Sequence, residues 1–230
     1  EEPQVITDIQ RQYVEAGCDV ITANTFGANA HKLDGAATVA DVFAAAVTCA
    51  REAGARYVAG DIGPIGALLR PLGTLSFDEA YDLFAEEVRA GVDAGVDLFI
   101  IETMTDLAEI KAAVLACREN SDLPVFATMT FEEDGRTFLG TSPEVAAITL
   151  DAIGADVLGI NCSQGPAELR GLAARMLTVT DKPVMVQANA GLPHVDDDGN
   201  TVFDIQAPEY AEAVAGMIED EESRSEERRV

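Results

Sequence analysis

Short runs of consecutive apolar residues alternate along the chain with longer stretches that repeat their apolar positions every three to four residues. Runs that are apolar at successive positions are typical of parallel strands buried on both faces, whereas strict alternation would indicate a half-exposed antiparallel strand. Each run follows a small-residue turn and ends in a polar residue. The predicted strands lie within residues 16–26, 53–64, 94–104, 123–131, 154–163 and 182–191.

The longer stretches have the apolar spacing of amphipathic helices. Ser76 and Asp106 each precede such a stretch and are followed three residues later by a glutamate, Glu79 and Glu109, which is the spacing of a capping box. Ser142 stands before a proline and a glutamate, a further helix-start signal. The predicted helices span residues 3–16, 38–53, 76–94, 106–120, 142–153, 167–179 and 207–219.

Strand and helix alternate at roughly 30 to 40 residues per unit, which predicts an α/β fold with a parallel sheet, either doubly wound or closed as a (βα)8 barrel. No GxGxxG follows the first strand, and polar residues end nearly every strand, which favours the TIM-type barrel. Since about six strands are visible, we expect an incomplete barrel over residues 1–218 that lacks its first and last strands. Residues 219–230 are expected to form a charged tail, either helical or disordered.

Composition narrows the class of protein. The chain has 230 residues, 48% of them hydrophobic, which is enough for one large domain. Its net charge of −26 argues against nucleic acid and membrane surfaces as partners. The same charge and the few lysines fit either a high-salt, halophilic cytoplasm or an ordinary acidic protein. Widely spaced cysteines without a CxxC pair, and no secretory leader or apolar span, favour a cytoplasmic location.

Polar side chains end the predicted strands, and in a barrel such residues meet at one mouth where the chemistry lies. Each of them alone is also explained as a turn former or a helix cap. The set as a whole indicates a site. Its members are Asn24, Asp61, Glu102, Thr128 or Thr130, Asn161 with Cys162, and Asn189.

Five segments in order resemble the homocysteine S-methyltransferase family, which includes the homocysteine-binding module of cobalamin-dependent methionine synthase and betaine–homocysteine methyltransferase. The resemblance covers residues 3 to 215, and "FEEDGRTFLGTSPEVAA" (131–147) is most similar to the cobalamin-dependent branch. The five segments are "AGCDVITANTFGAN" (16–29), "GDIGPIG" (60–66), "FIIETMTDLAEIKAAV" (99–114), "GINCSQGPAELR" (159–170) and "ANAGLP" (188–193).

This resemblance implies a barrel whose mouth holds zinc through three cysteines, one of which matches Cys162. Zinc would bind the sulfur of homocysteine as a thiolate, which then attacks an activated methyl group from a methyl donor. Glu102 matches the residue that receives the substrate ammonium. Asn24, Asn161 and Asn189 would line the same mouth, and Asp61 either joins them or caps the Gly-Pro turn that follows it.

The chain departs from the family pattern at two places. It has neither the acidic "DG" turn of the family's first strand nor the "GGCCGT"-like last strand with the other two zinc cysteines, so the zinc site is incomplete. We therefore expect a homocysteine S-methyltransferase domain truncated at both ends. The remaining cysteines, Cys18, Cys49 and Cys117, are expected in the core, and His31 and His194 on the surface or in loops.

Two alternatives remain open at the level of sequence. The first is a non-catalytic barrel remnant that acts as a binding or interaction protein, with its open sheet edges paired to another copy or to a partner chain. The second is a different barrel enzyme in which Asp61 and Glu102 hold a divalent metal.

Overall fold

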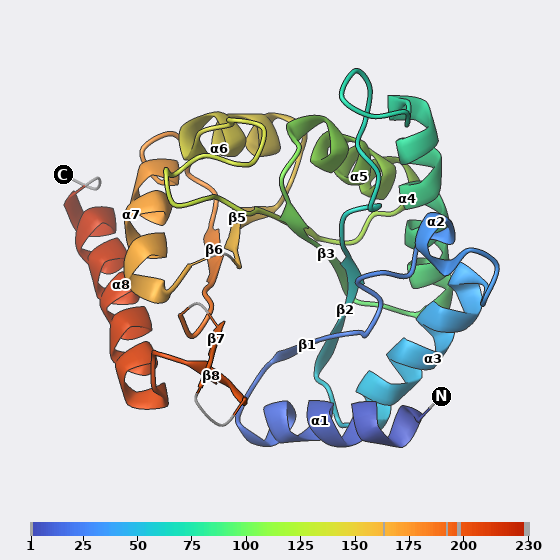
Figure 1. The fold of residues 1–230 in the computed structure, drawn as a ribbon, viewed down its shortest axis with the longest axis horizontal. Coiled ribbons are helices and arrows are strands. Elements are labelled where there is room, and N and C mark those ends of the chain that lie inside the picture. Colours follow the sequence, from blue (N-terminus) through green and yellow to red (C-terminus); the bar gives the residue numbers. More distant parts are fainter. Residues whose placement is uncertain (1, 163, 192, 197–198, 228–230) are drawn as a thin grey trace.

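The computed structural model describes residues 2–162, 164–191, 193–196 and 199–227. Six parallel strands form one sheet in chain order, each paired with its sequence neighbour. Figure 1 shows the strands as an arc with the helices on its outer side. The predicted strands and the incomplete TIM-type barrel are thus confirmed. The strands are β1 (Val20–Thr22), β2 (Tyr57–Ile62), β3 (Leu98–Met104), β4 (Val125–Met129), β5 (Val157–Asn161) and β6 (Val184–Gln187).

All seven predicted helices are present, and a short α2 that the pattern did not predict follows β1. No helix among the described residues is long and apolar enough to cross a lipid bilayer. The last helix continues past residue 218, where the charged tail was expected to begin, and ends at Glu227. The helices are α1 (Pro3–Glu15), α2 (Ala30–Leu33), α3 (Val39–Glu52), α4 (Phe77–Ala94), α5 (Leu107–Asn120), α6 (Pro143–Ala152), α7 (Pro166–Met176) and α8 (Ala207–Glu227).

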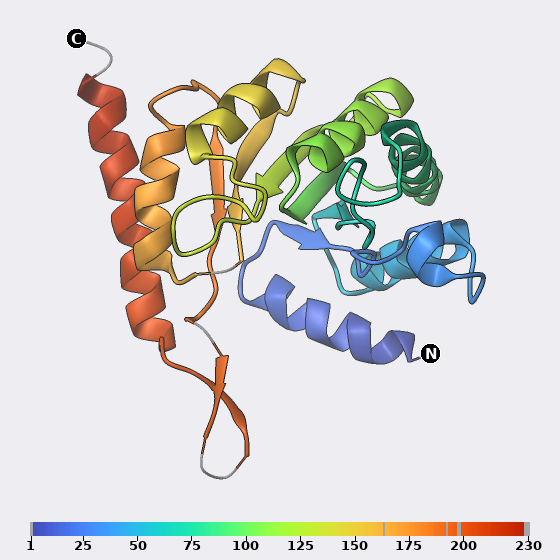
Figure 2. The same cartoon turned by 45° about the horizontal axis from the view of Figure 1, so that its top comes forward.

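A β-hairpin that the sequence pattern did not predict lies between the sheet and the last helix. It pairs β7 (Pro193–Val195) with β8 (Thr201–Phe203) in antiparallel fashion, and Figure 2 shows it projecting away from the sheet. Its strands have three residues each, too few to show an alternation of apolar and polar positions.

The three predicted helix caps are present, but one of the two predicted capping boxes is incomplete. Ser76 and Glu79 form the complete capping box, and Ser142 accepts from a backbone N–H of its helix. Asp106 also caps its helix, but the carboxylate of Glu109 does not return to it. Glu109 instead accepts a hydrogen bond of 2.8 Å from the N–H of Ile65, in the loop after β2. The capping-box prediction is therefore wrong at Glu109, because the neighbouring loop offers it an unpaired buried donor.

The convex face of the sheet is buried, as the continuous apolar runs predicted, while the concave face is buried at its centre and partly covered around it. On its concave side Ala59, Leu98 and Ile100 form a small cluster with Val20, Phe126 and Met185. On its convex side the strands pack against the helices in the main core. Fully buried strand residues of that core include Ile62, Phe99, Ile101, Met104, Met129 and Leu158.

The cysteines divide between core and surface. Cys49 and Cys117 are buried in their helices, as predicted, and all four cysteines are free. Cys18 is exposed, so its predicted place in the core is wrong. It follows Gly17, whose φ of 100° turns the chain between α1 and β1, so Cys18 lies in the connecting turn and belongs to neither element.

Gly159 on β5 gives a test of this packing. A Cβ at this position would lie 2.0 Å from the carbonyl oxygen of Met185 on β6, so Gly159→Ala should lower the free energy of unfolding by roughly 1–3 kcal/mol. Gly171→Ala is the matched control, because nothing lies within 4 Å and a helix interior favours alanine by roughly 0.5–1 kcal/mol. Urea denaturation of both variants measures the difference, and equal midpoints would contradict the described register.

Candidate functional site at the mouth of the half-barrel

The carboxyl ends of the strands bring the predicted site residues to one side of the sheet. Positions on the concave face recur every second residue along each strand. Ile100 and Phe126 lie on this face, in the cluster with Met185, and the polar residues that follow them at the same spacing are Glu102 and Thr128. Asp61, the last residue but one of β2, lies on the same face, two residues after Ala59.

Asn161 is the centre of the contacts at this edge, and its side chain is only 2% exposed. Its Oδ1 accepts from the N–H of Thr103 and from Oγ1 of Thr128, each at 2.8 Å. Its Nδ2 donates to Oγ1 of Thr103 at 2.7 Å and to Sγ of Cys162 at 3.4 Å. Thr130 donates to the backbone carbonyl of Asn161 at 3.0 Å. One amide thus connects the ends of three strands.

Cys162 follows in a tight turn. Its φ of 59° lies in the left-handed region, which a non-glycine residue seldom adopts, and its N–H donates to the carbonyl oxygen of Gln187 at 3.0 Å. The sulfur lies 3.8 Å from Oγ1 of Thr103 and is half-buried. Cys162 is therefore held at the mouth through its backbone by the neighbouring strand β6, and its sulfur contacts β3, two strands away in the sheet.

Asp61 and Glu102 form an electrostatic pair on adjacent strands. Asp61 is 8% exposed, and its Oδ1 has no hydrogen-bond partner among the described residues. Burial, and then the nearby charge of Glu102, raise the pKa of Asp61 to about 8. Burial also raises the pKa of Glu102. No positively charged side chain among the residues that the structure describes contributes to the pKa of either group, so a cationic ligand beside them would be favourable.

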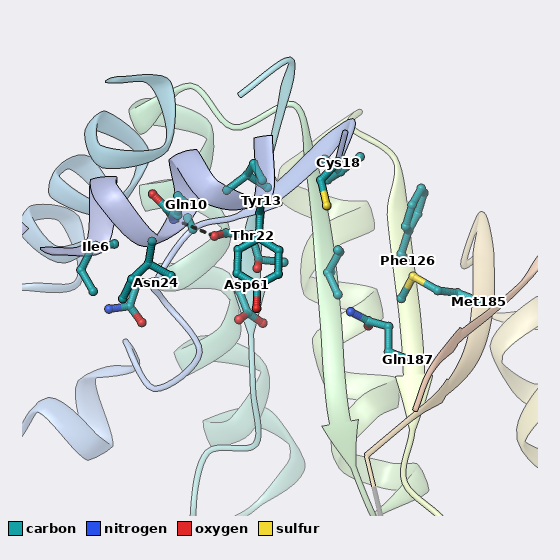
Figure 3. A pocket seen from close by; sticks show the side chains of 15 residues that line it. Ile6, Gln10, Tyr13, Cys18, Thr22, Asn24, Asp61, Phe126, Met185 and Gln187 are labelled. Carbon is teal, nitrogen blue, oxygen red and sulfur yellow. Dashed lines mark hydrogen bonds between the residues drawn. The ribbon is translucent and has the colours of Figure 1, made fainter. Parts of the chain in front are cut away.

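A cavity of about 540 Å³ lies between α1 and the concave face of the sheet, and Asp61 is the member of this pair that lines it. Figure 3 shows its mixed lining, with Asn24 and Asp61 on one side and Phe126, Met185 and Gln187 on the other. Gln10 of α1 donates to the carbonyl of Thr22 at 3.0 Å and so ties the helix to β1. The volume suits a small molecule, and Asp61 is the acidic residue of its lining.

The predicted site residues do not all meet. Asp61 lies with Glu102, Asn161 lies with Cys162, and Thr103, the residue after Glu102, joins the two pairs. Asn24 is exposed and lines the cavity from the loop after β1. Asn189 is half-buried after β6, where its backbone N–H donates to the carbonyl of Gln164 at 3.0 Å.

Cys162 and its neighbours do not by themselves fit a zinc site. Within the described ranges, no three His, Cys, Asp or Glu side chains come together as a group able to hold a metal ion. The side chains beside Cys162 are a hydroxyl and an amide, whereas zinc sites use three or four thiolate, imidazole or carboxylate donors. His194 lies on the β7–β8 hairpin, 3.4 Å from Asp204, and His31 lies on α2.

Sequence reasoning missed two residues that the structure singles out. Thr103 contacts both Asn161 and Cys162, yet no sequence signal marks it beyond its place next to Glu102. Glu87 on α4 is fully buried, and neither of its carboxylate oxygens has a hydrogen-bond partner among the described residues. Burial raises the pKa of Glu87 well above its usual range, and Asp61 adds to this effect while Lys32 opposes it. A glutamate at an apolar position of a helix was the available signal for Glu87.

Sequence relatives of known activity cover the chain almost completely. Methionine synthase of Mycobacterium leprae is 34% identical over 94% of this chain, and methionine synthase of Mycobacterium tuberculosis is 35% identical over 94%. The chain spans only 19% of the length of either relative.

Solved structures share the fold. The oxidized form of the homocysteine methyltransferase MmuM from Escherichia coli superposes with a TM-score of 0.74 and 21% identity, over 82% of this chain and 72% of that one. Its metallated form gives a TM-score of 0.71 at 23% identity, over 83% of this chain and 74% of that one. The sequence model that describes homocysteine S-methyltransferases matches residues 1–224. The chain belongs to the homocysteine S-methyltransferase family.

Proposed function

We propose that this chain binds homocysteine at the mouth of the half-barrel as part of a methyl transfer that forms methionine. The observation that carries the proposal is the pair of inward carboxyl groups, Asp61 and Glu102, beside the turn that presents Cys162. Glu102 would receive the ammonium of the amino acid, with Asp61 as a second carboxyl group that ionises when the ammonium binds, and Asn24, Asn161 and Asn189 would line the mouth. The relatives support the substrate class.

Zinc is part of this proposal only through Cys162, which is the thiol that the described part of the chain offers at the mouth. A single thiolate does not hold zinc tightly. The methyl-transfer step is therefore proposed for the whole protein, which also takes up a methyl donor, and not for these residues alone.

A second candidate function is non-catalytic binding or interaction. It is favoured by the outer edges of β1 and β6, which pair with no further strand among the described residues. Unpaired strand edges invite pairing with another chain, so a homo-oligomer or a partner chain at these edges is proposed. The acidic surface opposes nucleic acid and anionic membranes as partners. We also propose a cytoplasmic, high-salt setting, supported by the four free cysteines and the net charge.

Replacing Glu102 tests the ammonium contact. Charge-assisted hydrogen bonds contribute roughly 1.5–3 kcal/mol, so Glu102→Gln should weaken homocysteine binding about ten- to a hundredfold. Glu52→Gln, at the exposed end of α3, removes the same charge away from the mouth and should leave the affinity unchanged. Calorimetry measures both, and equal affinities for the two variants would refute the role of Glu102.

The pH dependence of binding tests Asp61. Because its pKa is raised to about 8, the carboxyl group is largely protonated at pH 6 and largely ionised above pH 8. An ammonium ligand binds the ionised form more tightly, so binding releases a proton, and affinity should rise with pH by at most about tenfold per unit. L-Methionine, which has no thiol to titrate, is the ligand to use between pH 6 and 8. In Asp61→Asn this rise should disappear, and a rise that survives the substitution would assign it to another group.

Metal content tests the role of Cys162. After dialysis against metal-free buffer, the 230-residue chain should retain well under one zinc ion, because one thiolate cannot replace three or four donors. Cys162→Ser should remove what remains, whereas Cys117→Ser, buried in α5, should not. Inductively coupled plasma mass spectrometry measures the ratio. One tightly held zinc per chain would contradict this prediction and point to His31 or His194 as ligands.

A further inference from the structure

Strand β3 contains one more residue than its partner at the point where the site begins. Ile101 is opposite Ala127 on β4, but Met104 is opposite Met129, so three steps along β3 match two along β4. Thr103 lies within this bulge with a φ of 63°, in the left-handed region that a β-branched residue rarely adopts. Backbone strain of this kind persists only where surrounding contacts hold it in place.

The bulge decides which way the side chains around it point. Ile100 lies on the concave face and Ile101 in the convex core, so strict alternation would place both Glu102 and Met104 on the concave face. Met104 is instead fully buried in the convex core, while the charge of Glu102 acts on Asp61. The extra residue therefore lets the carboxyl group enter the mouth while the next apolar side chain stays in the core.

The side chain of Asn161 holds the bulge. The N–H of Thr103 can only donate, so the atom that it meets at 2.8 Å must be the amide oxygen of Asn161. The Nδ2 group then faces Oγ1 of Thr103 at 2.7 Å and Sγ of Cys162 at 3.4 Å, which uses both of its hydrogens. Since Oγ1 of Thr103 accepts from Asn161, its own hydrogen is free to point at the sulfur, 3.8 Å away.

We infer that Thr103 and Asn161 are positioning residues that fix Glu102 and Cys162 relative to each other. The inference deepens the proposed function and rests on it for the identity of the ligand. One amide fixes the strained residue after Glu102 and also donates to the thiol that follows Asn161 in the chain. The ends of a bound amino acid would thus meet two groups whose separation is set by a single hydrogen-bonded unit.

Thr103→Gly separates positioning from stability. Glycine adopts a positive φ without strain, and this gain offsets the loss of the hydroxyl that accepts from Asn161, so the melting temperature should change little. The lost hydroxyl and the looser backbone should still weaken homocysteine binding by about tenfold or more. A residue that only stabilised the fold would lower both quantities together. Thr103→Ser restores the hydroxyl and should recover most of the affinity. Asp34→Gly relieves the same backbone conformation at the exposed end of α2 and should leave the affinity unchanged.

A ligand-free measurement separates this inference from the proposed function. The side-chain amide protons of Asn161 should be protected from exchange with solvent in the wild-type chain and in Thr103→Ser, and should lose protection in Thr103→Gly, as followed by ¹⁵N NMR. Equal protection in the wild type, Thr103→Ser and Thr103→Gly would refute the positioning role of Thr103 and Asn161. Full homocysteine affinity in Thr103→Gly would refute it as well. If protection is lost only in Thr103→Gly and the wild-type chain binds no homocysteine, the positioning role of Thr103 and Asn161 is supported and the proposed function is rejected.

Discussion

A single buried amide, the side chain of Asn161, holds the ends of three parallel strands in register at the mouth of the half-barrel. It bonds to Thr103 on β3 and to Thr128 on β4, while its own backbone belongs to β5. Neighbouring parallel strands are joined by backbone hydrogen bonds only as far as they pair, and β3 loses its regular pairing before Met104. The hydrogen bonds of this amide replace the missing backbone bonds at the end of β3. They also help Thr103 and Cys162 to keep left-handed conformations, which cost roughly 1–3 kcal/mol each.

Electrostatic strain accompanies this backbone strain. Asp61 and Glu102 lie on adjacent strands with raised pKa values, and Glu87 is buried behind them on α4. In a chain with a net charge of −26, no general excess of positive charge offsets these groups. In the proposed function, a cationic group at the mouth would stabilise the ionised form of both carboxyl groups, and the pair would therefore select a ligand that carries an ammonium. The carboxyl pair is in this sense a stronger indication of an amino-acid ligand than the thiol is.

The sequence predicted the strands and long helices because each depends on local patterns. Continuous apolar runs such as 98–101 are explained only by burial on both faces, and Ser76 with Glu79 marks a helix start without any tertiary contact. The hairpin of β7 and β8 was missed because its strands are too short for a periodic signal. Cys18 was misplaced because its exposure follows from the turn at Gly17 and not from its own polarity.

At the site, the sequence identified which residues end the strands but not how they are connected. The positions of Asp61, Glu102 and Cys162 near strand ends could be predicted because each follows a buried apolar run, while their roles in binding stay predictions. Thr103 could not, because a bulge is a property of the register between β3 and β4, and no single strand encodes it. The same holds for Glu109, whose capping-box spacing was correct while its hydrogen bond went to Ile65 on another loop. Thr103 and Glu109 each contact a residue of another element, and these contacts between elements fix the geometry of the site. A pattern within one segment does not encode them.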